Sequence, residues 1–175
     1  MNNLYLIGYR GVGKSSIAPM LARKCGWTVV EMDDRIEQKE QTTIADIFAE
    51  QGEEGFRNLE TQMLREVAMS SKQVISTGGG IVLREDNRYL MRETGIVVWL
   101  QASAETIFNR LNHHSSRQRS KRPALTTLPI QDEITTLMNE RSVLYATTSH
   151  FSVNTESHKL NEIVGIILTQ LNWWV

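Results

Sequence analysis

Residues 4–21, LYLIGYRGVGKSSIAPML, join an apolar run to a glycine-rich segment that ends in a lysine and two serines. Gly8, Gly13, Lys14 and Ser15 satisfy the pattern G-x-x-x-x-G-K-S. Glycine permits positive φ and close backbone approach, so the amides of such a loop can turn inward around phosphate oxygens. The segment that follows has a helical pattern, and the positive N-terminal end of a helix attracts the same anion. These residues therefore predict a nucleoside triphosphate site.

The last two residues of this motif have separate expected tasks. Lys14 supplies a mobile positive charge for the β- and γ-phosphate oxygens, and the Ser15 hydroxyl is a candidate ligand of Mg²⁺. A phosphate loop identifies the donor of a phosphoryl group, but it leaves the acceptor open. The acceptor must be inferred from acids and arginines further along the chain.

Acids that follow the second apolar run could serve the acceptor. In EMDD, residues 31–34, strand alternation predicts that Glu31 and Asp33 share a face and point into one crevice. An acceptor hydroxyl needs a carboxylate within hydrogen-bond reach, and Asp33 is the candidate base. Asp34 is expected to face away and to act as the N-cap of the next helix, where Asp is favoured.

Two arginines and a glycine run lie further along. Arg57 and Glu60 are three residues apart and share a helical face, where a surface ion pair would contribute under ~1 kcal/mol. TGGG, residues 77–80, directly follows an apolar run and indicates close approach of the backbone to another group. Arg141, taken alone, is typical of a surface position.

Short β-rich runs alternate with longer helical stretches. The expected strands are LYLI, TVVE, QVIS, IVVWL and HFSV, and the expected helical stretches are 14–25, 33–70, 85–94, 103–112, 130–147 and 158–172. This alternation predicts a mainly parallel sheet with helices on both faces. In such a fold, ligands bind beyond the carboxyl ends of the strands, where the three polar motifs fall. Residues 112–129 lack a clear period and are basic, which favours a mobile lid over phosphates.

Composition restricts the class of protein. A chain of 175 residues is most simply one domain, and a net charge of −1 gives no reason to expect nucleic acid or a membrane surface as a partner. No apolar run approaches the ~20 residues of a membrane span. One cysteine excludes an internal disulfide framework and fits a reducing compartment, so we expect a cytoplasmic protein.

Taken together, the motifs resemble the shikimate kinase family over nearly the whole chain. IADIFAEQGEEGFRNLE, VISTGGGIV, RPAL and ERSVLY follow the phosphate loop in the family's order and approximate spacing. The resemblance implies one three-layer α/β/α domain over residues 1–175, of the P-loop kinase type, with a central five-stranded parallel sheet. It also implies substrate-binding helices at about 33–61 and a mobile lid at about 112–127.

The same resemblance implies a reaction. A monomer would use ATP and Mg²⁺ to phosphorylate the 3-hydroxyl of shikimate, giving shikimate 3-phosphate and ADP in the pathway to chorismate and the aromatic amino acids. The implied catalytic residues are Asp33, Lys14 and Arg122. The implied nucleotide contacts are Gly11, Val12, Gly13, Lys14, Ser15, Ser16, Arg110 (near the adenine) and Arg122 (on the lid). The implied shikimate contacts are Asp33, Arg57, Gly78, Gly79, Gly80 and Arg141, and Mg²⁺ would be held by Ser15 and, through water, by Glu31.

The chain departs from the family pattern at three places, one of which is a lid that is long and unusually basic. Glu31 stands where the family commonly has Asp, and VNTESHKL has no arginine where many members place one against adenine. Other functions also remain open. A kinase for a gluconate-like acceptor would not need Arg57 and Arg141 set against Asp33. A nucleoside monophosphate kinase must bind an acceptor phosphate and a second base, and a non-catalytic nucleotide-binding module would not need Lys14, Asp33 and Arg122 together.

Overall fold

Five parallel strands form the centre of the protein. The computed structural model describes residues 3–113 and 129–171, and its strands are β1 (Asn3–Ile7), β2 (Thr28–Glu31), β3 (Gln73–Ser76), β4 (Gly95–Gln101) and β5 (Phe151–Asn154). Their order in the sheet is β2-β3-β1-β4-β5, and each neighbouring pair is parallel. The predicted five-stranded parallel sheet is confirmed.

The connections between the strands are helical, as the sequence predicted. They are α1 (Lys14–Cys25), α2 (Met32–Glu40), α3 (Ile44–Ala68), the short 3₁₀ helix η1 (Ile81–Leu83), α4 (Glu85–Thr94), α5 (Ala104–His113), α7 (Ile130–Thr148) and α8 (Leu160–Leu171). The predicted stretch 33–70 consists of two helices, α2 and α3. No helix of residues 3–113 and 129–171 is long and apolar enough to cross a membrane.

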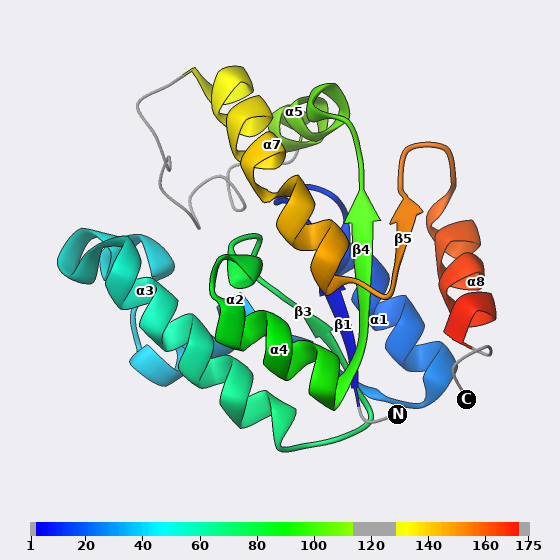
Figure 1. The fold of residues 1–175 in the computed structure, drawn as a ribbon, viewed down its shortest axis with the longest axis horizontal. Coiled ribbons are helices and arrows are strands. Elements are labelled where there is room, and N and C mark those ends of the chain that lie inside the picture. Colours follow the sequence, from blue (N-terminus) through cyan, green and yellow to red (C-terminus); the bar gives the residue numbers. More distant parts are fainter. Residues whose placement is uncertain (1–2, 114–128, 172–175) are drawn as a thin grey trace.

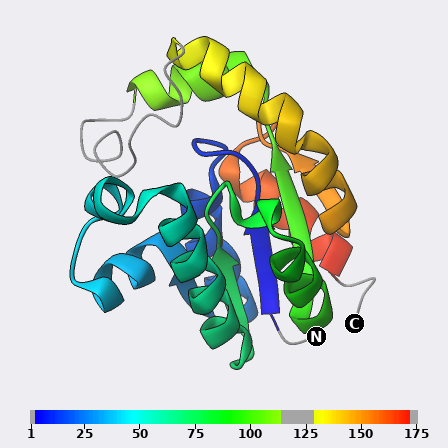
Figure 2. The same cartoon turned by 60° about the vertical axis from the view of Figure 1, so that its left-hand side comes forward.

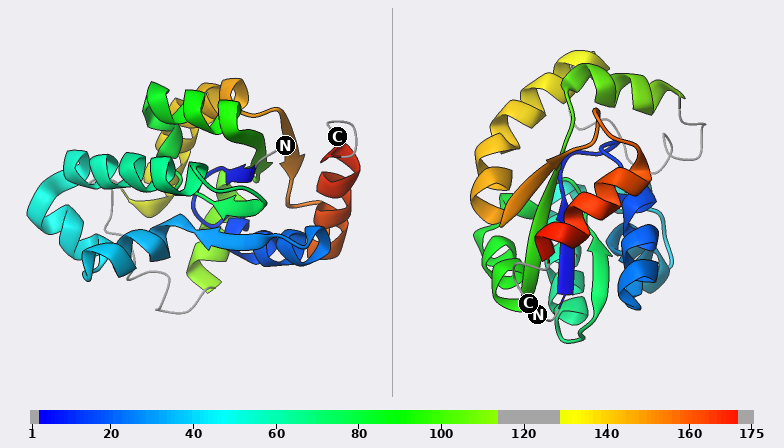
Figure 3. Two further views of the ribbon diagram at one scale, coloured as in Figure 1. Left: turned by 90° about the horizontal axis from the view of Figure 1, so that it is seen from below. Right: turned by 90° about the vertical axis from the view of Figure 1, so that its right-hand side faces the viewer.

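Alternate residues of the central strand face two separate cores. Leu4 and Leu6 belong to a cluster with the apolar residues of α1 and α8, whereas Tyr5 and Ile7 pack with those of α2, α3 and α4. The left panel of Figure 3 shows the sheet between α3 and α4 on one side and α1 on the other. The three-layer arrangement follows from this alternation, because both faces of β1 are fully buried.

One end of the sheet carries most of the polar motifs. In Figure 1, the arrows of β4 and β5 point toward α5 and the first half of α7, and Figure 2 shows the loop between β1 and α1 below the same two helices. Helix α5 ends at His113 and α7 begins at Ile130. The predicted lid at about 112–127 therefore begins inside α5, and its remaining residues, including Arg122, lie outside the described residues.

Candidate functional site

The loop between β1 and α1 has the backbone that a phosphate cradle requires. Gly11 and Gly13 have φ of 79° and 109°, conformations that other residues rarely adopt. Helix α1 begins directly after Gly13, so its positive end faces the loop. The Nζ of Lys14 is buried and donates to the carbonyls of Gly8 at 2.7 Å and Tyr9 at 3.0 Å. Lys14 therefore lies inside the loop, with Val12 buried beside it.

A serine and a glutamate lie together where the sequence predicted a magnesium site. The Ser15 hydroxyl donates to Glu31 Oε2 at 3.0 Å, while Glu31 Oε1 is buried with no hydrogen-bond partner among the described residues. Burial raises the pKa of the Glu31 carboxyl, and Asp34 adds to this, while hydrogen bonds from Ser76 and Ser15 oppose it. In the described part of the chain, no three acidic, histidine or cysteine side chains form a metal cluster. This set still fits Mg²⁺, which usually takes one or two protein ligands plus water and phosphate.

The turn after β2 differs from the prediction in its details. The strand ends at Glu31, which is also the N-cap of α2, and Met32 already starts the helix and is fully buried. Strand alternation therefore does not orient Asp33, which lies partly buried in the first helical turn. The expectation that Asp34 caps this helix is wrong, because Asp34 lies inside the same turn. Both aspartates are in the turn that follows Glu31.

The TGGG segment brings the phosphate loop and Arg57 close to one backbone. A Cβ added to Gly79 would lie 3.4 Å from the Arg10 amide nitrogen and from the Gly8 carbonyl oxygen. A Cβ added to Gly80 would lie 2.3–2.4 Å from the guanidinium of Arg57. Gly78 accepts a backbone hydrogen bond from Ile81, which starts η1. The predicted close approach is confirmed, and it joins the loop after β1 to helix α3.

Arg57 is part of a buried ion pair. Its Nη1 donates to Glu60 Oε2 at 2.6 Å, and the side chains are 5% and 1% exposed. Glu53 binds the same guanidinium from the solvent side, at 3.2 Å. The alternative of a surface pair between Arg57 and Glu60 is therefore wrong. Removing one member of a buried pair leaves an uncompensated charge and typically costs 3–5 kcal/mol, so Glu60 holds the arginine in place.

Arg141 is also buried, at 5% exposure, which corrects the expectation of a surface residue. Its Nε has no hydrogen-bond partner among the described residues. One turn further along α7, the Tyr145 hydroxyl donates to the Gly79 carbonyl. Burial raises the pKa of Tyr145 to about 12, although nearby Arg141 lowers it. Buried polar atoms without partners are rare, so Arg141 stays a candidate for ligand binding.

The comparisons with known proteins agree with this geometry. The shikimate kinase family model matches residues 10–172. The chain belongs to the shikimate kinase family. A shikimate kinase of Rhodopirellula baltica is 38% identical over 166 residues, which cover 95% of this chain and 88% of the relative. A shikimate kinase 2 of Enterobacter sp. is 40% identical over 168 residues, which cover 96% of this chain and 94% of the relative.

A solved structure gives the same result at the level of the fold. The shikimate kinase from Acinetobacter baumannii in complex with shikimate superposes with a TM-score of 0.89 at 30% identity, covering 98% of this chain and 93% of that chain. Membership of this kinase family makes ATP the phosphoryl donor.

In this family member, Arg110 connects three segments at the phosphate loop. It donates from α5 to the carbonyl of Val12 at 3.2 Å and to the hydroxyl and carbonyl of Thr155 at 2.9 and 2.8 Å. Thr155, directly after β5, itself donates to the Val12 carbonyl at 3.1 Å. Arg110 thus lies at the edge of the phosphate loop, and its adenine contact stays a prediction. Ser16 is exposed in the first turn of α1.

The sequence reasoning missed a second ion pair at this site. Arg10, inside the phosphate loop, donates from Nη2 to Glu133 Oε1 at 2.7 Å. Glu133 lies in the first turn of α7 and is almost fully buried. The sequence offered one signal, the spacing between Glu133 and Arg141. Residues eight apart lie about two turns apart on the same stripe of a helix, so Glu133 could be expected on the face that carries Arg141.

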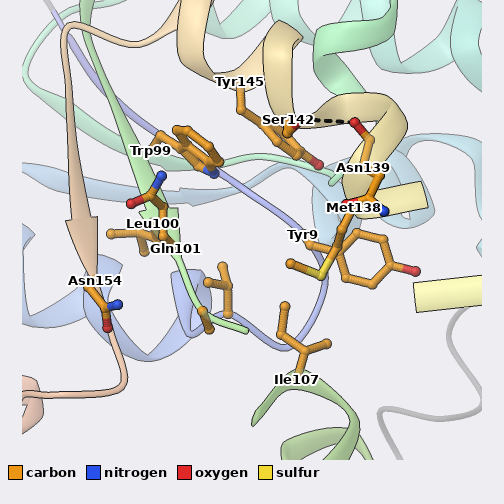
Figure 4. Close-up of a pocket in the computed structure, with 12 residues that line it drawn as sticks. Tyr9, Trp99, Leu100, Gln101, Ile107, Met138, Asn139, Ser142, Tyr145 and Asn154 are labelled. Carbon is orange, nitrogen blue, oxygen red and sulfur yellow. Dashed lines mark hydrogen bonds between the residues drawn. The ribbon is translucent and has the colours of Figure 1, made fainter. Parts of the chain in front are cut away.

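A cavity of about 290 Å³ lies beside the site, between α7 and the end of β4. Figure 4 shows Trp99 beside Tyr145 on one side of the cavity and Tyr9, from the phosphate loop, beside Met138 on another. Its lining has carboxamides and hydroxyls but no charged side chain. The cavity is lined by Tyr9 and Val12 of the phosphate loop and by Tyr145, whereas Asp33 and Lys14 do not line it.

Proposed function

We infer that the protein transfers the γ-phosphoryl group of ATP to the 3-hydroxyl of shikimate. One observation carries this inference: Gly79 faces the phosphate loop while its neighbour Gly80 faces the buried guanidinium of Arg57. In this proposal a site for phosphates adjoins a site for a carboxylate. Membership of the shikimate kinase family supports shikimate as the acid that occupies it.

We propose that the loop after β1 binds and orients the donor. The backbone amides of Gly11, Val12 and Gly13 and the first turn of α1 surround the phosphates, and Lys14 exchanges its two carbonyl acceptors for phosphate oxygens. When bound, Mg²⁺ neutralises phosphate charge. Ser15 would be its direct ligand, and the orphan oxygen of Glu31 would hold a water in its shell.

We propose that two arginines grip the acceptor. Arg57 and Arg141 would bind the carboxylate, with charge-assisted hydrogen bonds of ~1.5–3 kcal/mol each. Backbone amides of Gly78, Gly79 and Gly80 would contact the ring substituents. A ring whose rotation is fixed places one hydroxyl in line with the γ-phosphorus, and such positioning supplies much of the catalysis of phosphoryl transfer.

In this proposal, Asp33 accepts the proton of the attacking hydroxyl. Arg122 would then approach the transferring phosphoryl group from the lid, where its charge stabilises the transition state, and lid closure would exclude water as a competing acceptor. Arg110 would lie against the adenine. We further propose that the protein is a monomer, as the family resemblance implies. We propose that it is cytoplasmic, because a single cysteine fits a reducing compartment.

The test is ADP release measured in parallel with shikimate, gluconate, nucleoside monophosphates and no acceptor. We expect turnover with shikimate to exceed every other condition by at least about 100-fold. Preference for gluconate would instead establish a different small-molecule kinase. ADP release that no acceptor stimulates would mean that the protein binds nucleotide without transferring phosphate to an alcohol.

A further inference from the structure

The ion pair between Arg10 and Glu133 has no role in the chemistry described above. It joins the phosphate loop to the first turn of α7, and its side chains are 22% and 2% exposed. Burying a carboxylate is costly, and even a good buried pair is a weak source of stability. We therefore explain the pair by its effect on position, because it holds the phosphate loop against the first turn of α7.

One face of α7 carries this pair and the site arginine together. Glu133, Leu137, Arg141 and Tyr145 follow one another at intervals of four, and all four are buried. The helix is tied to the phosphate loop through Glu133 and to the TGGG segment through Tyr145, whose hydroxyl donates to the Gly79 carbonyl. Arg141 lies between these two ties, in the part of the helix that they join to the phosphate loop and to the TGGG segment.

The phosphate loop can transmit a change to this helix. Lys14 Nζ donates to the carbonyls of Gly8 and Tyr9, and the Tyr9 carbonyl belongs to the peptide unit that leads into Arg10. A phosphate that attracts the ammonium withdraws it from that peptide. Tyr9 also lies within electrostatic range of Arg10, Glu133 and Arg141, although burial is the main reason that its pKa is raised.

We propose that the Arg10–Glu133 pair is a positioning contact that transmits occupancy of the phosphate loop to Arg141. A nucleotide that orders the phosphate loop also orders α7 through this pair. The acceptor carboxylate then binds at a smaller cost in conformational entropy, because α7 is already ordered. Nucleotide and acceptor therefore bind with positive coupling. The identity of the acceptor, a hydroxylated carboxylic acid, rests on the proposed function.

The experiment compares Glu133→Gln with the matched control Asp132→Asn. Asp132 is exposed in the same helical turn, so the control removes the same charge without touching Arg10. Titration calorimetry gives the dissociation constant of shikimate with and without MgADP. In the wild type and in the control we expect MgADP to tighten shikimate binding by roughly 5- to 50-fold. In Glu133→Gln this factor should fall to about 1–2, with MgADP affinity in the absence of shikimate nearly unchanged.

A charge-reversed pair, Arg10→Glu with Glu133→Arg, should recover part of the coupling that either reversal alone removes. It also covers the case in which Glu133→Gln fails to fold. Coupling in Glu133→Gln equal to that of the control, or no recovery in the double variant, would overturn the proposal.

A second measurement separates this inference from the proposed function. Hydrogen exchange of amides 137–145, with and without MgADP, needs no acceptor. We expect nucleotide to protect these amides in the wild type and in Asp132→Asn but not in Glu133→Gln. If the wild type does not bind shikimate but Glu133→Gln still loses the nucleotide-dependent protection, only the assigned acceptor is refuted. Equal protection in all three proteins would refute the transmission through Glu133.

Discussion

At the scale of single residues, the Glu31 carboxyl beside Ser15 has a raised pKa. Burial raises the pKa of the Glu31 carboxyl above its ordinary 4.5. The folded protein then binds this proton more readily than the unfolded chain does. The free energy of unfolding should therefore fall as the pH rises from 4.5 through the raised pKa, so the ionised carboxylate costs stability.

Glu31→Gln should test this role through magnesium. The variant should need roughly 10-fold more Mg²⁺ for half-maximal rate, because an amide orders a metal-bound water less well than a carboxylate does. The Mg²⁺ requirement of the wild type should rise as the pH is lowered toward the raised pKa, and this dependence should vanish in the variant. Initial rates against Mg²⁺ at several pH values measure both effects. An unchanged requirement would remove Glu31 from the metal site.

Asp33 lies two residues further on, in the first turn of α2. Asp33→Asn should keep ATP affinity but lower kcat by roughly 10²–10⁴, or about 3–5 kcal/mol of barrier, because the amide cannot accept the hydroxyl proton. Nucleotide titration and steady-state rates separate the two effects. Near-normal turnover would exclude Asp33 as the base, and Asp34→Asn serves as the neighbouring control.

At the scale of elements, the TGGG segment sets the position of α3 against the phosphate loop. The guanidinium of Arg57 packs on Gly80 and is held there by Glu60 and Glu53. Gly80 itself has φ −96° and ψ 2°, a backbone that alanine can also adopt. The glycine is therefore required for the space that it leaves to Arg57.

Gly80→Ala should displace Arg57, because the new Cβ would lie 2.3–2.4 Å from its guanidinium atoms. We expect the KM for shikimate to rise by about 10- to 100-fold, or ~1.4–2.8 kcal/mol, with the KM for ATP changed less than about two-fold. Gly165→Ala is the matched control, since nothing lies within 4 Å of that position in α8. Equal KM values for shikimate in the two variants would contradict the packing argument.

At the scale of the whole molecule, the sheet places segments that are distant in sequence at one edge. The loop after β1, the turn after β2 and the TGGG segment after β3 all follow carboxyl ends of parallel strands. Helices α5 and α7 flank the segment that contains Arg122, and α7 returns Arg141 to this edge. The residues proposed for donor and acceptor thus come from separate parts of the chain to one edge of the sheet.

Arg122→Ala tests whether the segment between α5 and α7 completes this assembly. We expect kcat to fall by roughly 10²-fold while KM for shikimate changes little, because the arginine acts on charge that develops in the transition state. Lys121→Ala, which removes the adjacent positive charge, should have a much smaller effect. An unchanged kcat in Arg122→Ala would show that this arginine is not the lid residue of the reaction.

Local patterns were sufficient for much of this protein. The phosphate loop, the five strands, the two-sided cover of helices and the approach of backbone at TGGG follow from residue types and their period, because these depend on neighbouring residues. Strand alternation failed to orient Asp33, because the strand ends at Glu31 and α2 already starts at Met32. The sequence alone did not show that Met32 turns the chain.

Tertiary structure decided which charges are buried and what they touch. Arg141 is typical of a surface residue by itself, yet the packing of α7 on the sheet buries it beside Tyr145. The pairing of Arg10 with Glu133 joins residues 123 positions apart. Burial and long-range pairing depend on how whole elements pack, and that information is not contained in any short stretch of the chain.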